Sequence, residues 1–225
     1  MPSTKPDPTA WWNMNIPTTE HTVAVPIDLA GCSERDAALI GADESSYAPL
    51  SWEQCRAIVA ANYLEAFSRS PLELRRYRRA MYALAATHGS VASFLANDRI
   101  GWGEGEIKPH GTIPFETPED YKIVYNDWPY GLDPRIVHLV VWTKFQLVED
   151  PATGRLTALS AKQIDDFVGR TFRSRVPAEN VIWFKNWSAI KSVQALEHFH
   201  VLMFEPDTDF IREITNGDRP LCEKF

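Results

Sequence analysis

Two segments of β-branched and aromatic residues, 136–148 and 198–204, constrain the fold of this chain more than any other feature. Both have the composition of buried strands. Each also carries imidazoles: His138 in the first segment, and His198 with His200 in the second. A polar group on a buried strand costs free energy unless it is hydrogen-bonded or used. We therefore expect the functional site to lie where these strands meet.

The composition limits the class of protein and its surroundings. The chain has 225 residues, 44% hydrophobic and 12% aromatic, which is enough for one substantial core. The net charge of −7 argues against a protein that coats nucleic acid, although a local basic patch is compatible with it. Cys32, Cys55 and Cys222 lack CxxC spacing and are expected to be free thiols of a reducing compartment. There is no membrane-spanning run or signal peptide, so we expect a cytoplasmic protein without a membrane partner.

The order of the expected elements predicts an α+β fold, with N-terminal helices packed on a mainly antiparallel sheet. Residues 1–48 are expected to form an irregular arm, with Trp11–Trp12 docked onto the body. Residues 49–225 are expected to form a single α+β domain. In its helical part, 49–104, helices are expected after Ser51, after Ser70, and at 90–95.

The sheet part, 105–225, is expected to alternate strands with a few helices. Asp150–Gly154 is a turn signal, so the segment after it is expected to return antiparallel. Ser160 is the expected N-cap of the helix that follows. The expected strands are 112–115, 121–125, 136–148, 155–159, 181–184 and 198–204, and the expected helices are 160–172, 188–196 and 206–214.

His198 and His200 lie two residues apart, so both imidazoles point to one face of a strand. The segment is similar to the His-x-His-x-His strand of histidine-triad nucleotide-binding proteins, with Leu202 in the third position. Three interpretations stay open: a hydrogen-bonded pair in the sheet core, contact with a substrate, or a metal site completed by another side chain. We expect no metal; the candidates for a third ligand are Glu205, His138 and His110.

The block Asn126–Tyr130 is a second candidate region. Asn126 and Asp127 are turn formers, which is a sufficient structural explanation. The functional interpretation places Asp127 in a pocket between Trp128 and Tyr130. A carboxylate beside aromatic faces suits a guanidinium or an ammonium group.

Further candidates come from the same two strands. Trp142 and Trp183 are candidate walls of the pocket, and Asn186 is a candidate polar contact in it. Alternation predicts that Lys144 shares the face of His138. Lys144 is therefore a candidate base or nucleophile, or a side chain that extends to solvent.

Five arginines lie within eleven positions of this acidic chain: Arg69, Arg75, Arg76, Arg78 and Arg79. Such a run is usually a solvated helix face. Alternatively, it binds the phosphates of a tRNA acceptor stem, through backbone contacts that do not read sequence.

Several of these segments occur together in one order, which resembles the fungal N-acetylglucosamine-induced protein family over roughly residues 50 to 205. The resemblance implies a fungal-type cytosolic protein. Some members of this group are arginine-containing cyclodipeptide synthases with an Asp-Asp-x-x-Glu motif; here Asp165–Asp166 is followed by Gly169. The motifs are Arg69–Pro71, Leu74, Tyr77, Tyr82, His88–Val91, Arg99–Trp102, Asn126–Tyr130, Ile136–Lys144 and Asn186–Val201.

The resemblance implies an aminoacyl transferase that joins arginine from arginyl-tRNA to a second amino acid and closes a diketopiperazine. Asp127 or Glu205 would bind the arginine, a histidine would transfer protons, and no metal, ATP or other cofactor would be needed. One alternative is a histidine-triad-like nucleotide or sugar-phosphate transferase or hydrolase. The other is a non-enzymatic sensor in the N-acetylglucosamine response.

Overall fold

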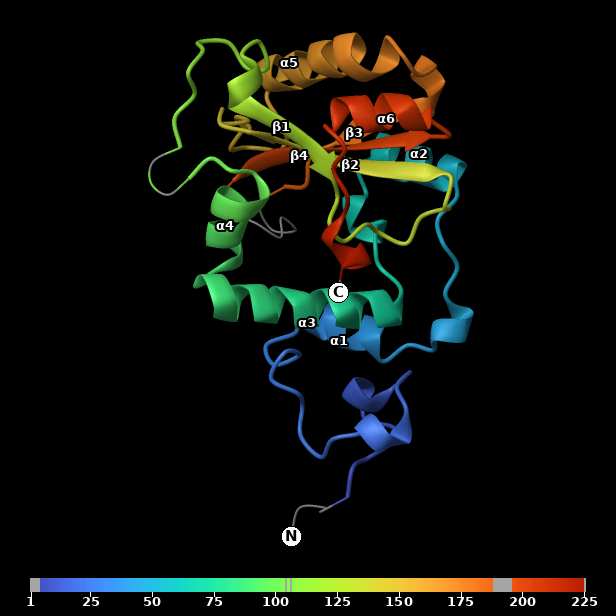
Figure 1. Ribbon diagram of the computed structural model, residues 1–225. Helices are drawn as coiled ribbons and strands as arrows, with labels where there is room; N and C mark the ends of the chain where they lie inside the picture. The colour runs from blue at the N-terminus through green and yellow to red at the C-terminus, as the bar shows by residue number, and fades with distance from the viewer. Residues whose placement is uncertain (1–4, 104, 106, 188–195, 225) are drawn as a thin grey trace.

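An antiparallel sheet forms the centre of the computed structural model, which describes residues 5–103, 105, 107–187 and 196–224. Within these residues the sheet has four strands in the order β1-β2-β4-β3, and helices cover both of its faces (Figure 1). The expected α+β class is confirmed. The strands are β1 (Tyr121–Tyr125), β2 (Ile136–Thr143), β3 (Val181–Phe184) and β4 (Glu197–Phe204).

The register of the two central strands sorts their side chains onto two different faces. Val140 pairs with His200, and Trp142 pairs with His198, so these residues share one face by alternation. We call this the histidine face. The residues between them form the apolar face. The histidine face comprises His138, Val140, Trp142, His198, His200 and Leu202, and the apolar face comprises Leu139, Val141, Phe199, Val201 and Met203.

Two helices cover the apolar face, α5 (Ala158–Val168) and α6 (Thr208–Ile214). Thr157 caps α5 by accepting a hydrogen bond from the backbone of Ser160, so the helix starts earlier than the expected cap at Ser160. A π-helical turn, Gly169–Arg173, continues it. The side chains that these elements bury against the strands are hydrocarbon or aromatic, and this region is the main core.

The histidine face is covered by the helices of the N-terminal half: α2 (Trp52–Ala61), α3 (Pro71–His88) and α4 (Val91–Phe94). Their expected starts are confirmed. Ser51 forms a capping box at α2, and Ser70 caps α3, which has proline at its first position. A π-helical turn, Leu95–Arg99, follows α4.

The N-terminal arm packs against the outer side of α3 (Figure 1). Trp11 and Trp12 take part in this packing, which confirms their expected docking. The arm is not irregular throughout, because Ser33 caps a helix, α1 (Glu34–Ile40). Short 3₁₀ turns in the chain are Trp11–Asn13, Thr18–Glu20, Glu44–Ser46, Leu64–Ala66, Pro118–Asp120, Ala178–Asn180 and Leu221–Glu223.

Several expected boundaries were wrong. Residues 112–115 form turns, and Phe115 has a φ of 65°, which a strand does not allow. Strand β2 ends at Thr143, where its partner β1 begins at Tyr121. The expected strand 155–159 contributes one isolated bridge, Glu149 to Leu156.

Other expectations concern the last third of the chain. The strands at 181–184 and 198–204 and the helix within 206–214 are confirmed. The expected helix at 188–196 lies, except for its last position, outside the described residues. No helix in the described part of the chain is both long enough and apolar enough to cross a membrane.

Candidate functional site

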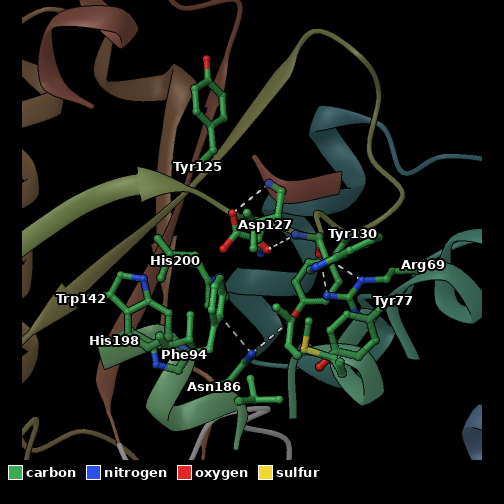
Figure 2. Close-up of a pocket in the computed structure, with 18 residues that line it drawn as sticks. Arg69, Tyr77, Phe94, Tyr125, Asp127, Tyr130, Trp142, Asn186, His198 and His200 are labelled. Carbon is green, nitrogen blue, oxygen red and sulfur yellow. Dashed lines mark hydrogen bonds between the residues drawn. The ribbon is translucent and has the colours of Figure 1, made fainter. Parts of the chain in front are cut away.

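A small cavity lies between the histidine face and the helices α3 and α4 (Figure 2). Its volume is about 90 Å³, room for several water molecules or for the end of a small ligand. Aromatic and aliphatic side chains form most of its wall, and a few polar groups interrupt them. The polar and aromatic lining residues are Arg69, Tyr77, Phe94, Tyr125, Asn126, Asp127, Trp128, Tyr130, Trp142, Asn186, His198 and His200, and the aliphatic ones include Met81, Leu84, Val91, Leu95, Val140 and Leu221.

A chain of hydrogen bonds runs beneath this cavity. Asn126 Nδ2 lies 3.1 Å from His138 Nε2, and His138 Nε2 lies 3.0 Å from His200 Nδ1. His200 Nε2 lies 3.3 Å from Asn186 Nδ2, which also donates to the Tyr130 hydroxyl at 3.1 Å. Asn126 and Asn186 extend the alternation of β1 and β3, so the sheet places all four polar groups on one face.

The direction of these hydrogen bonds is assigned from one backbone group and from the shorter of two contacts. Asn126 Oδ1 accepts from the amide of Trp128 at 3.0 Å, so Asn126 Nδ2 is a donor to the His138 ring. It lies 3.1 Å from Nε2 and 3.4 Å from Nδ1, and we assign the closer nitrogen, Nε2, as the acceptor. His138 Nε2 is then an acceptor, and His200 Nδ1 must donate to it. In a neutral imidazole His200 Nε2 is consequently an acceptor for Asn186 Nδ2. We call this directed chain, from Asn126 through His138 and His200 to Asn186, the imidazole relay.

Both relay histidines are held neutral. Burial lowers the pKa of His138 to about 3, and the charge of Arg69 acts in the same direction. Burial also holds the pKa of His200 well below its usual value, with further contributions from His138, His198 and Arg69. The relay is therefore a set of neutral hydrogen bonds at physiological pH.

His198 lies beside the relay and differs from it. Its Nδ1 is 3.0 Å from the carbonyl oxygen of Leu196, which can only accept, so Nδ1 carries a proton. The ring lies 4.4 Å, centroid to centroid, from that of Trp142. His198 also lines the cavity.

Asp127 lines the cavity, as expected, but it already binds a guanidinium of the protein itself. Arg99 Nε donates to both carboxylate oxygens, at 2.9 and 2.8 Å, and Leu221 N donates at 3.0 Å. Arg99 also binds Asp218 at 2.6 and 2.7 Å. Burial raises the pKa of Asp127 against the opposing effect of Arg99. Sequence reasoning missed Arg99, although it stands in one of the recognised motifs.

Two expected pocket residues, Lys144 and Glu205, do not line the cavity. Lys144 follows the end of β2, and its Nζ lies 3.7 Å from the buried Asp120 and 3.3 Å from His110. Glu205 is exposed and pairs with Arg135 at 3.5 Å. The expectation that these side chains share the cavity was wrong.

Trp183 lies on the opposite side of the sheet, where it pairs with Val201 and packs against Phe199. Its Nε1 donates to Asp165 at 3.0 Å, and Arg173 binds the same carboxylate. The expected role of Trp183 as a wall of the pocket is therefore wrong. The Asp165–Asp166 pair lies on α5, which covers the apolar face.

The five arginines do not form one solvated stripe. Arg75 is buried and donates to Trp12 O at 2.8 Å, and Arg78 reaches Ala30 O at 3.5 Å. Both hold the N-terminal arm. Arg69 donates to Trp128 O at 3.0 and 2.6 Å within the cavity wall. Only Arg76 and Arg79, of these five, are classed as exposed.

The exposed pair is also engaged. Arg76 binds Glu73 at 2.6 Å and donates to Cys222 O at 3.0 Å, and Arg79 lies 3.6 Å from Asp28. Among the described residues, no group of three or more His, Cys, Asp or Glu is arranged to hold a metal ion.

Comparison with known proteins identifies relatives of the chain. It is 27% identical to N-acetylglucosamine-induced protein 1 of Candida albicans over 188 residues, 75% of this chain and 74% of the relative. It is also 27% identical to the uncharacterized protein YPL067C of Saccharomyces cerevisiae over 165 residues, 69% and 79% of the two chains. The crystal structure of HTC1 shares the fold: its TM-score is 0.63 at 24% identity, over 74% of this chain and 95% of HTC1.

The expected resemblance to the fungal N-acetylglucosamine-induced proteins is confirmed, while the link to cyclodipeptide synthases stays a prediction. The pattern of a family described as protein of unknown function (DUF3605) matches residues 51–204. That match spans both faces of the sheet and the whole imidazole relay. The chain therefore belongs to the DUF3605 family, with homology to fungal N-acetylglucosamine-induced protein 1.

Proposed function

We propose that the chain is an aminoacyl transferase of the arginine-containing cyclodipeptide synthase type, and that the cavity on the histidine face receives the reacting amino acid. The observation that carries this proposal is the cavity lining. Neutral imidazole and amide groups stand beside aromatic rings, and both Arg69 and Asp127 line the same space. An amino acid ester has an amine that donates and a carbonyl that accepts, and such a lining can bind both.

The reaction needs little beyond positioning and proton transfer. The α-amine of a second aminoacyl-tRNA attacks the ester carbonyl of arginyl-tRNA. A C–N bond forms, the C–O bond to the first ribose breaks, and the amine proton passes to the released ribose oxygen, which leaves a dipeptide esterified to the second tRNA. The arginine α-amine of this dipeptide then attacks the remaining ester carbonyl. A second C–N bond closes the six-membered ring, and the second ribose oxygen leaves with the amine proton. Because both esters are already activated, neither ATP nor a metal is required.

His198 is the best candidate for the proton transfer. A base must reach the cavity with one ring nitrogen that exchanges its proton. His198 lines the cavity, and its ring is held by a hydrogen bond from Nδ1 to Leu196 O. His138 is not among the residues that line the cavity, and both ring nitrogens of His200 are hydrogen-bonded within the relay.

The proposed tRNA contact involves fewer arginines than the sequence indicates. Arg76 and Arg79 are the candidates that remain on the surface of α3, since Arg75 and Arg78 bind the N-terminal arm. Contacts with phosphates would make the affinity for tRNA fall steeply with salt. The Arg79 side chain is 68% exposed and lies 3.6 Å from Asp28, so this ion pair is weak enough to exchange for a phosphate.

The test is product formation from charged tRNA. The full chain is incubated with arginyl-tRNA and a mixture of other aminoacyl-tRNAs, and mass spectrometry is used to detect a diketopiperazine that contains arginine. We expect product with wild type, a loss of at least roughly a hundredfold with His198→Gln, and unchanged product with the surface control His110→Gln. Intact arginyl-tRNA and no product with the wild-type protein would exclude the proposal.

A second candidate is a binding protein without chemistry, a sensor in the N-acetylglucosamine response. One observation favours it: the relay is hydrogen-bonded on every ring nitrogen of His200, which suits a rigid binding site. It predicts that a sugar or metabolite raises the melting temperature without being changed. The histidine-triad-like alternative stays a prediction, tested by whether His200→Ala abolishes turnover of a nucleotide or sugar phosphate.

A further inference from the structure

Asn186 lines the cavity with one polar atom that lacks a partner. The residue is 5% exposed, and its Nδ2 donates to Tyr130 and His200. In the part of the chain that the structure describes, its Oδ1 has no hydrogen-bond partner. A buried acceptor without a partner costs free energy, so such an atom in a cavity wall indicates a missing ligand group.

The imidazole relay decides which atom of the Asn186 amide is left over. If the amide were turned over, Oδ1 would face His200 Nε2, and that nitrogen would then have to carry a proton. The relay as assigned does not allow this, because His200 donates its single proton from Nδ1 to His138. With this assignment Asn186 presents an acceptor to the cavity, while its Nδ2 is bonded to Tyr130 and His200 (Figure 2).

We propose that Asn186 is a specificity-determining residue whose Oδ1 selects a ligand group with an N–H or O–H donor. Amines, amides, guanidinium groups and hydroxyls satisfy it, whereas a carboxylate or a phosphate oxygen would place two acceptors against each other. Asn126, His138 and His200 are positioning residues that act through Asn186. The inference rests on the cavity being the substrate site of the proposed function, and it names the polarity that this site accepts.

The first experiment determines the tautomers of the relay histidines. Two-bond ¹H–¹⁵N correlations of the imidazoles in the full chain report the tautomer of each neutral histidine. We expect His200 protonated on Nδ1, the less common tautomer in free histidine, and His138 protonated on Nδ1 as well. A proton on His200 Nε2 would overturn the inference, because the Asn186 amide would then present its NH₂ group.

The second experiment measures the selectivity with two uncharged probes of nearly equal shape, benzamide and acetophenone. They differ by an NH₂ group in place of a methyl group, so the charges of Arg69 and Asp127 affect both alike. Wild type should bind benzamide roughly tenfold more tightly than acetophenone, the effect of one buried hydrogen bond. Asn186→Leu keeps the volume, removes the acceptor, and should bring the ratio close to one.

A ratio that Asn186→Leu leaves unchanged would overturn the proposal, and so would the absence of benzamide binding at millimolar concentration. Equal binding of the two probes by a protein that still forms a diketopiperazine would remove this inference and leave the proposed reaction standing. Selective binding of benzamide without any diketopiperazine would support this inference and exclude the proposed reaction. Circular dichroism and the melting temperature of Asn186→Leu show whether a lost preference comes from unfolding.

Discussion

The two faces of the central sheet come from the same strands, yet they differ in what they bury. On the apolar face, Leu139, Val141, Phe199 and Val201 meet α5 and α6 with no polar side chain among them. On the histidine face, residues one position away in the chain place three imidazoles at less than a tenth of their full exposure. Adjacent residues of one strand therefore serve two separate purposes.

The comparison shows what burial requires of each kind of group. Apolar side chains need only fit, and the hydrophobic effect holds them. His138 and His200 are stable in the interior because the relay gives them partners and because they remain neutral. The relay leaves one acceptor, Asn186 Oδ1, facing the cavity. Stabilisation of the fold alone does not explain an unpaired acceptor at this position.

The largest expected effect is on the apolar face. Phe199 is fully buried and its ring contacts those of Phe115, Phe167 and Trp183. Phe199→Ala should lower the free energy of unfolding by about 3–5 kcal/mol, measured by urea denaturation. Benzamide affinity of the remaining folded protein should not change. A loss below about 1 kcal/mol would mean that the apolar face is not the main core.

His200→Leu tests the opposite face. The change removes a ring that binds His138 and Asn186, and it leaves polar atoms of both without that partner. We expect a loss of about 2 kcal/mol in the free energy of unfolding together with the loss of probe selectivity. A variant as stable as wild type that keeps its preference for benzamide would show that the relay does not position Asn186.

Stability should also depend on pH through the same histidines. The pKa of His138 is lowered to about 3 and that of His200 lies well below its usual value, so between these values and about 6.5 only the unfolded chain binds the protons. The free energy of unfolding should therefore fall as pH drops below about 6.5, by up to ~1.4 kcal/mol per pH unit for each histidine.

The slope is measured by urea denaturation between about pH 5 and 6.5, where model carboxylates are mostly ionised. His200→Leu removes one of the two groups, and its slope should be about half that of wild type. Identical slopes for both proteins would show that these imidazoles are not held neutral in the folded state.

The smallest effect is expected on the surface, away from both faces. Arg79 has a side chain that is 68% exposed and lies 3.6 Å from Asp28. Arg79→Ala should change the free energy of unfolding by less than about 1 kcal/mol. If Arg79 contacts tRNA, the KM for arginyl-tRNA should rise and its salt dependence should weaken. A large loss of stability would instead assign Arg79 to holding the N-terminal arm.

Local rules predicted much of this architecture. Alternation placed His198 and His200 on one face, and the cap residues Ser51 and Ser70 marked the starts of α2 and α3. The same rule was misapplied elsewhere. Trp183 and Asn186 are three residues apart, and this odd spacing already indicates opposite faces of an extended strand. The rule failed for Lys144 because the strand ends one residue earlier.

The remainder depends on contacts between distant parts of the chain. Asp127 and Arg99 are 28 positions apart, and Asp218 binds the same guanidinium from 119 positions away. No periodicity links such residues, so the sequence predicts a free carboxylate where the fold has an ion pair. Arg75 is a similar case, since its burial is set by the N-terminal arm more than sixty residues earlier.

The most direct test of the central claim is a crystal structure of the full chain with 3′-arginylamino-3′-deoxyadenosine, a stable amide mimic of the end of arginyl-tRNA. We expect the arginyl group in the cavity on the histidine face, with a donor on Asn186 Oδ1 and the reacting carbonyl beside His198. Arginyl density bound elsewhere on the molecule, with the cavity unchanged, would contradict it.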